Sequence, residues 1–436
     1  MSESAPLVES KIIKVVFMCV VLFTQIAELL VCPPGSDINP YTWAHGNVRP
    51  ILVAGMTLQA WSLAALAVTC AIGVVVDRQK RTIRGSVTIW IGLFSISLIS
   101  LSSISFVSVY FDGLSKIVVP ILIYVYVAGW CSIDRRSVLA NTLHLINLMT
   151  AGQVFICRLF TGNFAALRYY YELPQEYFGY YYHLFAFAGV LGALTLFCLS
   201  EIASGRRIVM NLILLVFNLT FIYLSQVRTY LAAMTLSVVA MTLFYIVAPV
   251  SRDFAKRMTM LMFAAISSVC IAMVFPDIVG SRWQRADISS GRFERWGSDL
   301  AQFQSGSDLQ IIFGRGLGYV YHVNEWLFGV SINSLNLAID SLLDIGVAGL
   351  ILLGFTWLVI FFDAWKNGVH LLLVGVFVFM SSAAVITNIL EFTNVVVICV
   401  LVLSYAKFSR KDVPDEDSSA VPAAVSSSSG ERLMVG

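Results

Sequence analysis

Charged side chains are scarce in this sequence. Asp, Glu, Lys and Arg make up only 12% of its 436 residues, whereas hydrophobic residues make up 58%. A typical soluble domain carries about 25% charged residues, and a soluble fold of this length cannot bury so much apolar surface. Composition therefore predicts a membrane protein. The net charge of +2 is uninformative by itself, and we expect no nucleic-acid partner.

Regularly spaced cysteine pairs are also absent. The eight cysteines include no Cys-x-x-Cys pair, and most of them lie inside apolar runs, where cysteine acts as a small hydrophobic side chain. We therefore expect no disulfide framework and no metal site. The glycine-rich segment 313–319 is no Walker or dinucleotide motif, because no strand precedes it and no Gly-Lys-Ser/Thr follows. No cofactor is expected.

What the chain has in abundance is apolar runs long enough to cross a hydrocarbon core. They predict an all-α polytopic membrane protein with about twelve transmembrane helices. The predicted spans are 15–31, 51–76, 87–107, 117–133, 137–157, 182–200, 208–225, 229–250, 258–275, 346–362, 369–387 and 395–406. The chain thus divides into helices one to nine (1–275), a long loop (276–345), helices ten to twelve (346–406) and a disordered tail (407–436).

Lysine and arginine set the orientation, because cytoplasmic loops of membrane proteins carry an excess of both. If the N-terminus is cytoplasmic, 18 of the 28 basic residues fall in cytoplasmic segments. We therefore predict both termini and the tail in the cytoplasm, and the long loop before helix ten on the outer side of the membrane.

The ten basic residues left on the outer side include nine arginines. Arginine forms rigid bidentate pairs with phosphate and carboxylate groups, whereas lysine acts as a point charge. The excess of arginine favours an anionic ligand on this face. The alternative is that these arginines pair with acidic residues of the same loop, namely Asp287, Glu294, Asp299 and Glu325.

The long loop has three informative parts. In its first half, Arg292 and Arg295 share a face if the segment is helical, with Glu294 turned away, and such a face can grip a diphosphate. The glycines of 313–319 then predict a tight turn whose backbone approaches a ligand closely. The last part, 331–344, predicts an amphipathic helix running into span ten. Its polar face carries Asn333, Asn336, Asp340 and Asp344.

Other arginines lie where helices meet the outer surface. Arg158 follows span five, and Arg228 lies in the short turn 226–228, which holds its side chain at the membrane surface. Arg168 lies among tyrosines between 168 and 182. Those tyrosines are read either as an aromatic belt at the membrane interface or as a platform for sugar rings.

Four short motifs occur in an order that resembles the bacterial O-antigen polymerase and O-antigen ligase superfamily. They are Ser225–Leu231 entering a span, Gly291–Arg292 followed by Trp296, the glycine-rich Phe313–Gly318, and Asn336 followed ten residues later by Gly346–Leu350. Together they cover about residues 208–365, and the N-terminal half matches in hydropathy alone.

The resemblance implies an activity and a place. Such proteins lie in the bacterial inner membrane and use an active site that faces the periplasm. They transfer a glycan from an undecaprenyl-pyrophosphate carrier, without a nucleotide sugar. Polymerases extend another lipid-linked repeat unit, whereas ligases transfer the chain to the lipid A core. The implied partners are the lipid-linked glycan, membrane lipids and, as candidates, a chain-length regulator and a flippase.

Ligases place a histidine directly before the asparagine matched by Asn336, and here that position holds Leu335. Leucine neither accepts nor donates a proton, so the sequence favours a metal-independent polymerase over a ligase. A third alternative is a transporter or flippase for lipid-linked glycans, which shares the twelve-span plan. The two halves show no internal repeat of the kind that many transporters have.

The predicted mechanism places fixed guanidinium groups around the pyrophosphate, where they meet the charge that grows on the leaving group. The candidate pyrophosphate ligands are Arg158, Arg228, Arg282, Arg292, Arg295 and Arg315, of which Arg228 and Arg292 are also catalytic candidates. Asp340, His322 and Glu325 are candidate bases for the acceptor hydroxyl, with Asp340 first. Candidate glycan contacts are Asn336, Tyr319, Trp296 and Arg168.

Overall fold

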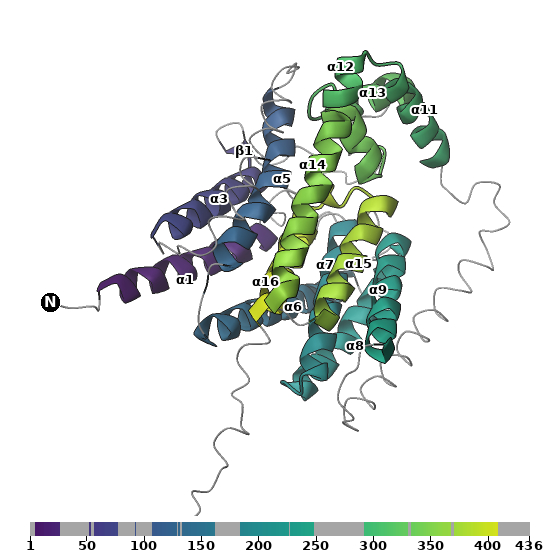
Figure 1. Ribbon diagram of the computed structural model, residues 1–436. Coiled ribbons are helices and arrows are strands. Elements are labelled where there is room, and N and C mark those ends of the chain that lie inside the picture. The colour runs from purple at the N-terminus through teal and green to yellow at the C-terminus, as the bar shows by residue number, and fades with distance from the viewer. Residues whose placement is uncertain are drawn as a thin grey trace, which may run out of the picture.

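Figure 1 shows the computed structural model of the chain. The described residues are 5–26, 52–53, 56–76, 92, 107–128, 130, 133–161, 184–225, 227–247, 292–329, 333–367 and 370–408. Within them, the prediction of an all-α chain is confirmed, apart from a hairpin of two short strands, β1 (Leu52–Val53) and β2 (Met56–Thr57). Nearly all of the predicted spans 87–107 and 258–275, and the tail beyond 408, lie outside these residues.

Three groups of helices follow one another along the chain. The first comprises α1 (Ala5–Ile26), α3 (Leu58–Val76), α5 (Val107–Ala128), α6 (Ile133–Thr161), α7 (Leu184–Ala203), α8 (Ile208–Ser225) and α9 (Arg228–Val247). The second comprises α11 (Arg292–Gln304), α12 (Asp308–Phe313) and α13 (Tyr319–Phe328). The third comprises α14 (Leu337–Asn367), α15 (His370–Ile386), the 3-10 helix η4 (Ile389–Glu391) and α16 (Thr393–Phe408).

Some predicted boundaries differ from the helices. The predicted span 208–225 coincides with α8, but α1 and α5 each begin ten residues before the predicted starts at 15 and 117. Both extensions carry charged residues, such as Lys11 in α1 and Asp112 in α5. Hydropathy marks the apolar stretch, whereas a helix continues for as long as its backbone hydrogen bonds can form.

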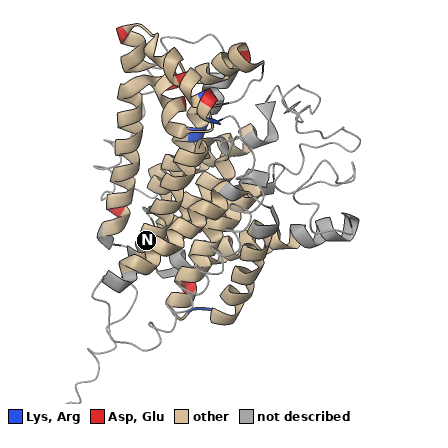
Figure 2. Ribbon diagram, turned by 90° about the vertical axis from the view of Figure 1, so that its right-hand side faces the viewer, with Lys and Arg blue, Asp and Glu red and all other residues tan. Residues whose placement is uncertain are grey.

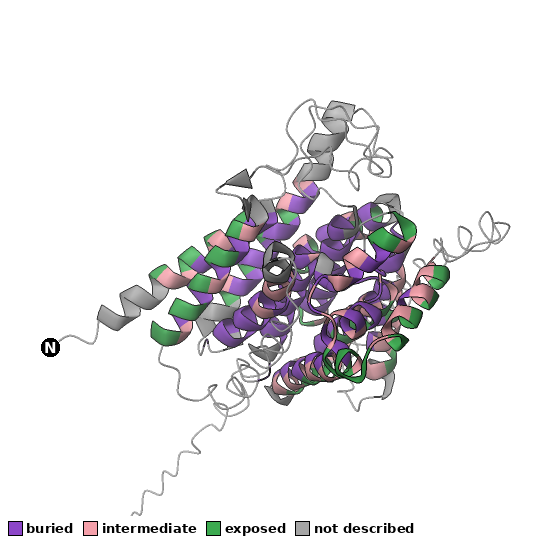
Figure 3. Ribbon diagram, turned by 90° about the horizontal axis from the view of Figure 1, so that it is seen from above, coloured by how far each residue is buried: buried purple, intermediate pink, exposed green. Residues whose placement is uncertain are grey.

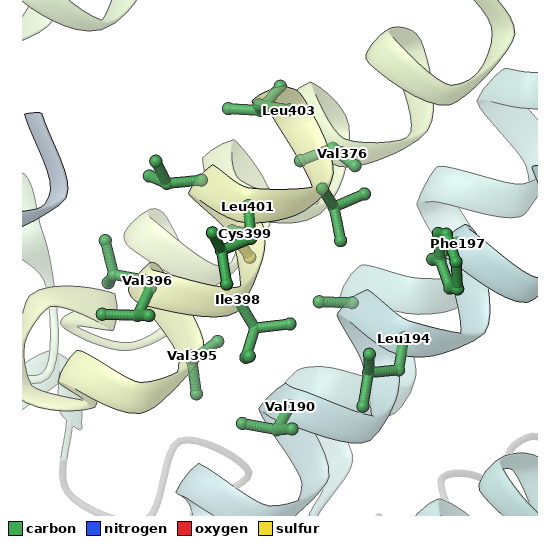
Figure 4. Close-up of a cluster of buried hydrophobic side chains, with 14 of the residues drawn as sticks. Val190, Leu194, Phe197, Val376, Val395, Val396, Ile398, Cys399, Leu401 and Leu403 are labelled. Carbon is green, nitrogen blue, oxygen red and sulfur yellow. The ribbon is translucent and has the colours of Figure 1, made fainter. Parts of the chain in front are cut away.

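The core lies where α7, α15 and α16 meet (Figure 4). Val190, Leu194 and Phe197 from α7 face Val376 of α15 and the apolar run from Val395 to Leu403 on α16. Every residue of α16 from 393 to 406 is buried, as expected for a helix that is hydrophobic on all sides. Seen from above, buried residues fill the centre of the bundle and exposed ones lie on its outer faces (Figure 3).

Glycine allows the closest of these contacts. A Cβ at Gly189 on α7 would lie 2.6 Å from Val395 Cγ2 and 2.8 Å from Tyr230 Cζ. Real side chains do not approach that closely, so any larger residue would push α16 and α9 away from α7.

The described charged residues gather toward two ends of the bundle (Figure 2). One end carries α11–α13 and is called the loop end; Gly113 near the start of α5 lies there, beside Leu317. The other carries the turn 203–207 and is called the turn end. At the turn end, Arg206 Nη1 donates to the Tyr405 hydroxyl at 3.3 Å and lies 3.6 Å from Glu201 Oε1.

An exposed apolar stripe runs down α14. Val347, Ile351, Phe355, Leu358 and Phe362 recur every three or four residues and are 37–65% exposed. Among the described residues, the segments 337–365 of α14 and 186–203 of α7 are long and apolar enough to cross a membrane, and seven further apolar helices are shorter. The stripe and these segments point to membrane association, because soluble proteins rarely expose contiguous apolar patches of this kind.

A pair of glycine substitutions tests the packing. Gly189→Ala should lower the free energy of unfolding by about 1–3 kcal/mol, because its methyl group overpacks the contact with Val395 and Tyr230. The matched control is Gly354→Ala on α14, where nothing lies within 4 Å of the added Cβ. That control should raise the melting temperature, since alanine favours the helix. Thermal unfolding of both purified variants decides, and equal shifts would contradict the close packing of α7.

Candidate functional site

The first half of the loop end is built on α11. This helix begins at Arg292, so Arg292 and Arg295 lie on one face, and both are partly buried while Glu294 is exposed. The predicted shared face, with Glu294 turned away, is therefore confirmed. Trp296 and Asp299 extend the same side of the helix, because residues three and four apart are neighbours on a helix surface.

Three side chains of α11 donate to backbone carbonyl groups of two other segments. Arg292 Nη1 donates to the oxygen of Ile386, at the end of α15, at 2.8 Å. Arg295 Nη1 donates to the oxygen of Asn333 at 3.4 Å, and Trp296 Nε1 to that of Ser334 at 2.7 Å. These hydrogen bonds attach α11 to the end of α15 and to the segment that precedes α14.

Asp340 joins those two segments to each other. Its Oδ1 accepts hydrogen bonds from the backbone N–H of Ser334, at 2.9 Å, and from the Ser334 hydroxyl. Its Oδ2 accepts from Asn388 Nδ2, just beyond α15, at 2.6 Å. The carboxylate is buried, so it fixes the positions of both segments that hold α11.

The segment 333–336 is a turn, which corrects the prediction of an amphipathic helix from 331. Helix α14 begins only at Leu337, because Asn336 Oδ1 caps it by accepting from the N–H groups of Ala338 and Ile339 at 3.0 and 3.3 Å. Asn333 Oδ1 accepts from the Leu335 N–H, and Leu335 has a φ of +58°. Asparagine side chains compete with the helix for backbone N–H groups in this way. The helical spacing of the apolar residues in 331–344 gave no sign of this turn.

Asn336 therefore uses its side-chain oxygen to start α14, and a contact of Asn336 with a glycan stays a prediction. Leu335, at the position where the ligases have histidine, lies inside the turn. Neither Ser334 nor Asn388 figured among the sequence candidates. A signal for Asn388 exists, since Thr387 and Asn388 interrupt an otherwise apolar run.

The predicted tight turn at 313–319 is confirmed, and its backbone approaches α14; a close approach to a ligand stays a prediction. The N–H groups of Arg315 and Gly316 donate to the oxygens of Leu343 and Asp344 at 2.9 and 2.8 Å. Gly314 has a φ of +79°, and a Cβ there would lie 2.3 Å from the Asp344 oxygen. Opposite it, Gly346 has a φ of +69° and breaks α14, at the position predicted to separate the loop from span ten.

Two further candidates support this turn. Arg315 donates to the hydroxyl of Tyr319 and to the oxygen of Gln302, the latter at 2.9 Å, and its guanidinium lies over the Tyr319 ring. Asp344 accepts from the N–H groups of Gly318 and Val320 at the start of α13, where a helix favours a negative charge. Arg315 therefore links Tyr319 to α11, and Asp344 links the start of α13 to α14.

The remaining candidates vary in how far the structure places them. Glu325 is exposed on α13 and His322 is partly buried there. Arg228 begins α9 and Arg158 lies near the end of α6, but their side chains lie outside the described atoms. Arg168 and Arg282 lie outside the described residues altogether.

The start of α9 lies at the loop end, close to the segment that Arg292 holds. Two residues after Arg228, the ring of Tyr230 stacks on Phe379 of α15 and contacts Phe392 at centroid distances of 5.8 and 6.4 Å. Phe392 and Ile386 lie on either side of η4, so the start of α9 lies near the segment whose carbonyl group Arg292 contacts.

Within the part of the chain that the structure describes, the charges and free donors of Arg292 and Arg295 favour a ligand-binding role for this arginine pair over a purely structural one. Burial and then the charge of Arg295 lower the pKa of Arg292. Burial also lowers the pKa of Arg295, and the charges of Asp299 and Asp340 partly offset this. A guanidinium has five N–H donors, yet among the described residues each of these arginines donates one hydrogen bond to another residue. Two like charges held together with spare donors can bind an anion.

Comparison with models of known protein families and with curated protein sequences gives no match. The resemblance to the O-antigen polymerase and ligase superfamily therefore stays a prediction from the motifs. Among the described residues, no group of three or more His, Cys, Asp or Glu side chains is arranged to hold a metal ion.

A swap of two side chains separates the structural and catalytic roles of Asp340. Asp340→Asn turns an amide toward the Asn388 amide, so it should lower the free energy of unfolding by about 1–3 kcal/mol. In the double variant Asp340→Asn with Asn388→Asp, the carboxylate–amide contact is restored in reverse. The melting temperature should then return most of the way to that of the wild type.

Activity of the same double variant is the second measurement. If Asp340 is the base for the acceptor hydroxyl, activity stays low although stability returns. If Asp340 only fixes the two segments, activity returns with stability. A swap that restores neither would contradict the bridging contact.

Proposed function

We propose that this chain is a glycan polymerase of the bacterial inner membrane. It spans the bilayer about twelve times, with both termini in the cytoplasm and the loop end in the periplasm. It transfers a glycan from undecaprenyl pyrophosphate to another lipid-linked repeat unit. No metal or nucleotide takes part in this proposal.

The distribution of polar and apolar surface supports the membrane part of the proposal. The stripe on α14 gives lipid tails an apolar face, while the described charged residues gather toward the two ends of the bundle (Figure 2). The turn end carries Arg206 and Arg207, and the excess of basic residues in cytoplasmic loops favours the cytoplasm for that end. The loop end then faces the periplasm.

The observation that carries the proposed activity is the arginine pair of α11. When the sugar–phosphate bond breaks, negative charge grows on the diphosphate. Arg292 and Arg295 lie within one helical turn and are partly buried, so their positive charges are less screened by water than those of exposed arginines. Hydrogen bonds to backbone oxygens already fix both side chains, and donors fixed before the reaction stabilise the transition state without reorganising during it.

The acceptor side of the reaction rests on the turn 333–340. In the predicted order of candidate bases Asp340 is first, and its charge acts on Arg295. Leu335, which replaces the ligase histidine, offers no proton acceptor. The proposal therefore assigns the second substrate as a lipid-linked repeat unit and not the lipid A core.

Polymerisation by the purified protein tests the proposal. The full chain in detergent is given a synthetic undecaprenyl-pyrophosphate repeat unit as the sole substrate, and products are separated on a gel. The wild type should produce a ladder of glycans. Arg292→Ala should slow its formation by about 10²–10³-fold, the loss expected when one fixed donor to the transition state is removed. Arg228→Ala should also abolish the ladder if Arg228 contacts the same diphosphate.

The matched control is Arg207→Ala, which removes an exposed arginine at the turn end and should leave the ladder unchanged. Arg292→Lys keeps the charge but loses the forked donor, so its rate should lie between those of Arg292→Ala and the wild type. If Arg292→Ala forms the ladder at the wild-type rate, the arginine pair is not the site that binds the diphosphate. If no ladder forms, addition of a lipid A-core acceptor tests for a ligase.

A further inference from the structure

Asp299 occupies an unusual position on α11. It lies one helical turn beyond Arg295 and is 0% exposed. Among the described residues, neither of its carboxylate oxygens has a hydrogen-bond partner at ordinary geometry, and the same holds for the side-chain oxygen and nitrogen of Asn324 and for Arg295 Nε. Buried polar groups normally have partners, and leaving them without is costly. This group is therefore poorly explained as a contact that stabilises α11 against α13.

The polar and charged groups around Asp299 come from three helices, and those from α11 and α14 carry charge. Burial raises the pKa of Asp299 to about 6, while the positive charge of Arg295 and the nearby amide of Asn324 lower it. Asn324, on α13, is neutral, and on α14 the charge of Asp340 acts on Arg295. The rest of this region is the apolar cluster of Val320, Ile339 and Leu343 with Trp296 and Phe303.

Asp299 and a bound diphosphate compete for the same charge. An ionised Asp299 neutralises part of the positive charge of Arg295 from within α11. A bound diphosphate would neutralise the same charge from outside the helix. A second negative charge near Arg295 disfavours the ionised form of a buried carboxyl group. Binding of a diphosphate and ionisation of Asp299 therefore oppose each other.

We propose that Asp299 is a positioning residue that acts through Arg295 and couples diphosphate binding to the uptake of one proton. As a carboxylate, Asp299 neutralises part of the positive charge of Arg295. As a neutral acid, it does not, and the full charge of Arg295 can attract the diphosphate. The inference rests on the proposed function, because it takes the arginine pair as the diphosphate site.

The direction of the pH effect follows from linkage. The bound diphosphate raises the pKa of Asp299 above its value of about 6 in the free protein, so affinity is highest below that pH and falls as pH rises through both values. A rise of one pKa unit corresponds to about a tenfold difference in Kd between the two limits. Proton uptake on binding should peak between the two pKa values.

Calorimetric titration of the full chain in detergent tests this. The probe is farnesyl-diphosphate-linked N-acetylglucosamine, a diphosphate diester that does not itself take up protons in the range from pH 5.5 to 7.5. Titration at each pH in two buffers of different ionisation enthalpy counts the protons taken up. With a bound pKa about one unit above the free value, the wild type should bind about sixfold more tightly at pH 5.5 than at pH 7.5, with proton uptake greatest near pH ~6.5, between the two pKa values.

Asp299→Asn should bind with the same Kd at both pH values, close to that of the wild type at pH 5.5, and without proton uptake. The amide is nearly isosteric with the neutral acid, so this variant should fold, and its melting temperature is the check. The matched control is Glu294→Gln, which removes the same charge from the exposed side of α11 and should keep the pH dependence of the wild type.

Two failures can be told apart. If Arg292→Ala abolishes binding but the wild type takes up no proton, or if Asp299→Asn keeps the pH dependence, the role of Asp299 is refuted while the arginine site stands. If the probe does not bind, or if Arg292→Ala and Arg295→Ala bind it as the wild type does, the arginine pair is not the diphosphate site. The proposed function then fails, and the inference with it.

Discussion

The loop end depends on one buried carboxylate. Asp340 accepts hydrogen bonds from Ser334 and from Asn388, and these two residues lie on the segments whose carbonyl groups hold Trp296 and Arg292. Without it, two neighbouring backbone segments with buried donors would face each other with no acceptor between them. Burying a charge is costly unless it is hydrogen-bonded, and this one is bonded on both of its oxygens. The orientation of α11 is thus fixed through this carboxylate.

Much of the helical plan was predictable from the sequence. Long apolar runs marked the positions of most helices of the first and third groups, because a run of about twenty apolar residues has few other stable structures in a bilayer. The face shared by Arg292 and Arg295 was predictable for a similar reason, since helical periodicity needs only local spacing. The break at Gly346 was not predicted, because the helix 331–344 was expected to run directly into span ten; the glycine there takes a positive φ that other residues avoid.

The contacts of the site were not predictable in the same way. The bond between Asp340 and Asn388 joins residues 48 positions apart, and nothing in the spacing of either residue announces the other. The turn at 333–336 was missed because Asn333 and Asn336 also fit the polar face of a helix. Only their bonds to backbone N–H groups show that they form a turn and a cap instead. The glycine-rich turn suggested a ligand for the same reason: an open backbone is equally suited to approach another backbone.

The contact between Gly314 and Gly346 has a consequence for assembly. Where α14 breaks, the carbonyl groups of Leu343 and Asp344 accept hydrogen bonds from the N–H groups of Arg315 and Gly316. These two donors lie in the turn between α12 and α13, which comes before α14 in the chain. The upper part of α14 thus receives its C-terminal cap from a separate segment. Neither segment satisfies its backbone alone, so the helix that enters the bundle and the turn above it must form together. The part of the chain that carries the arginines is therefore complete only after the helix below it is in place.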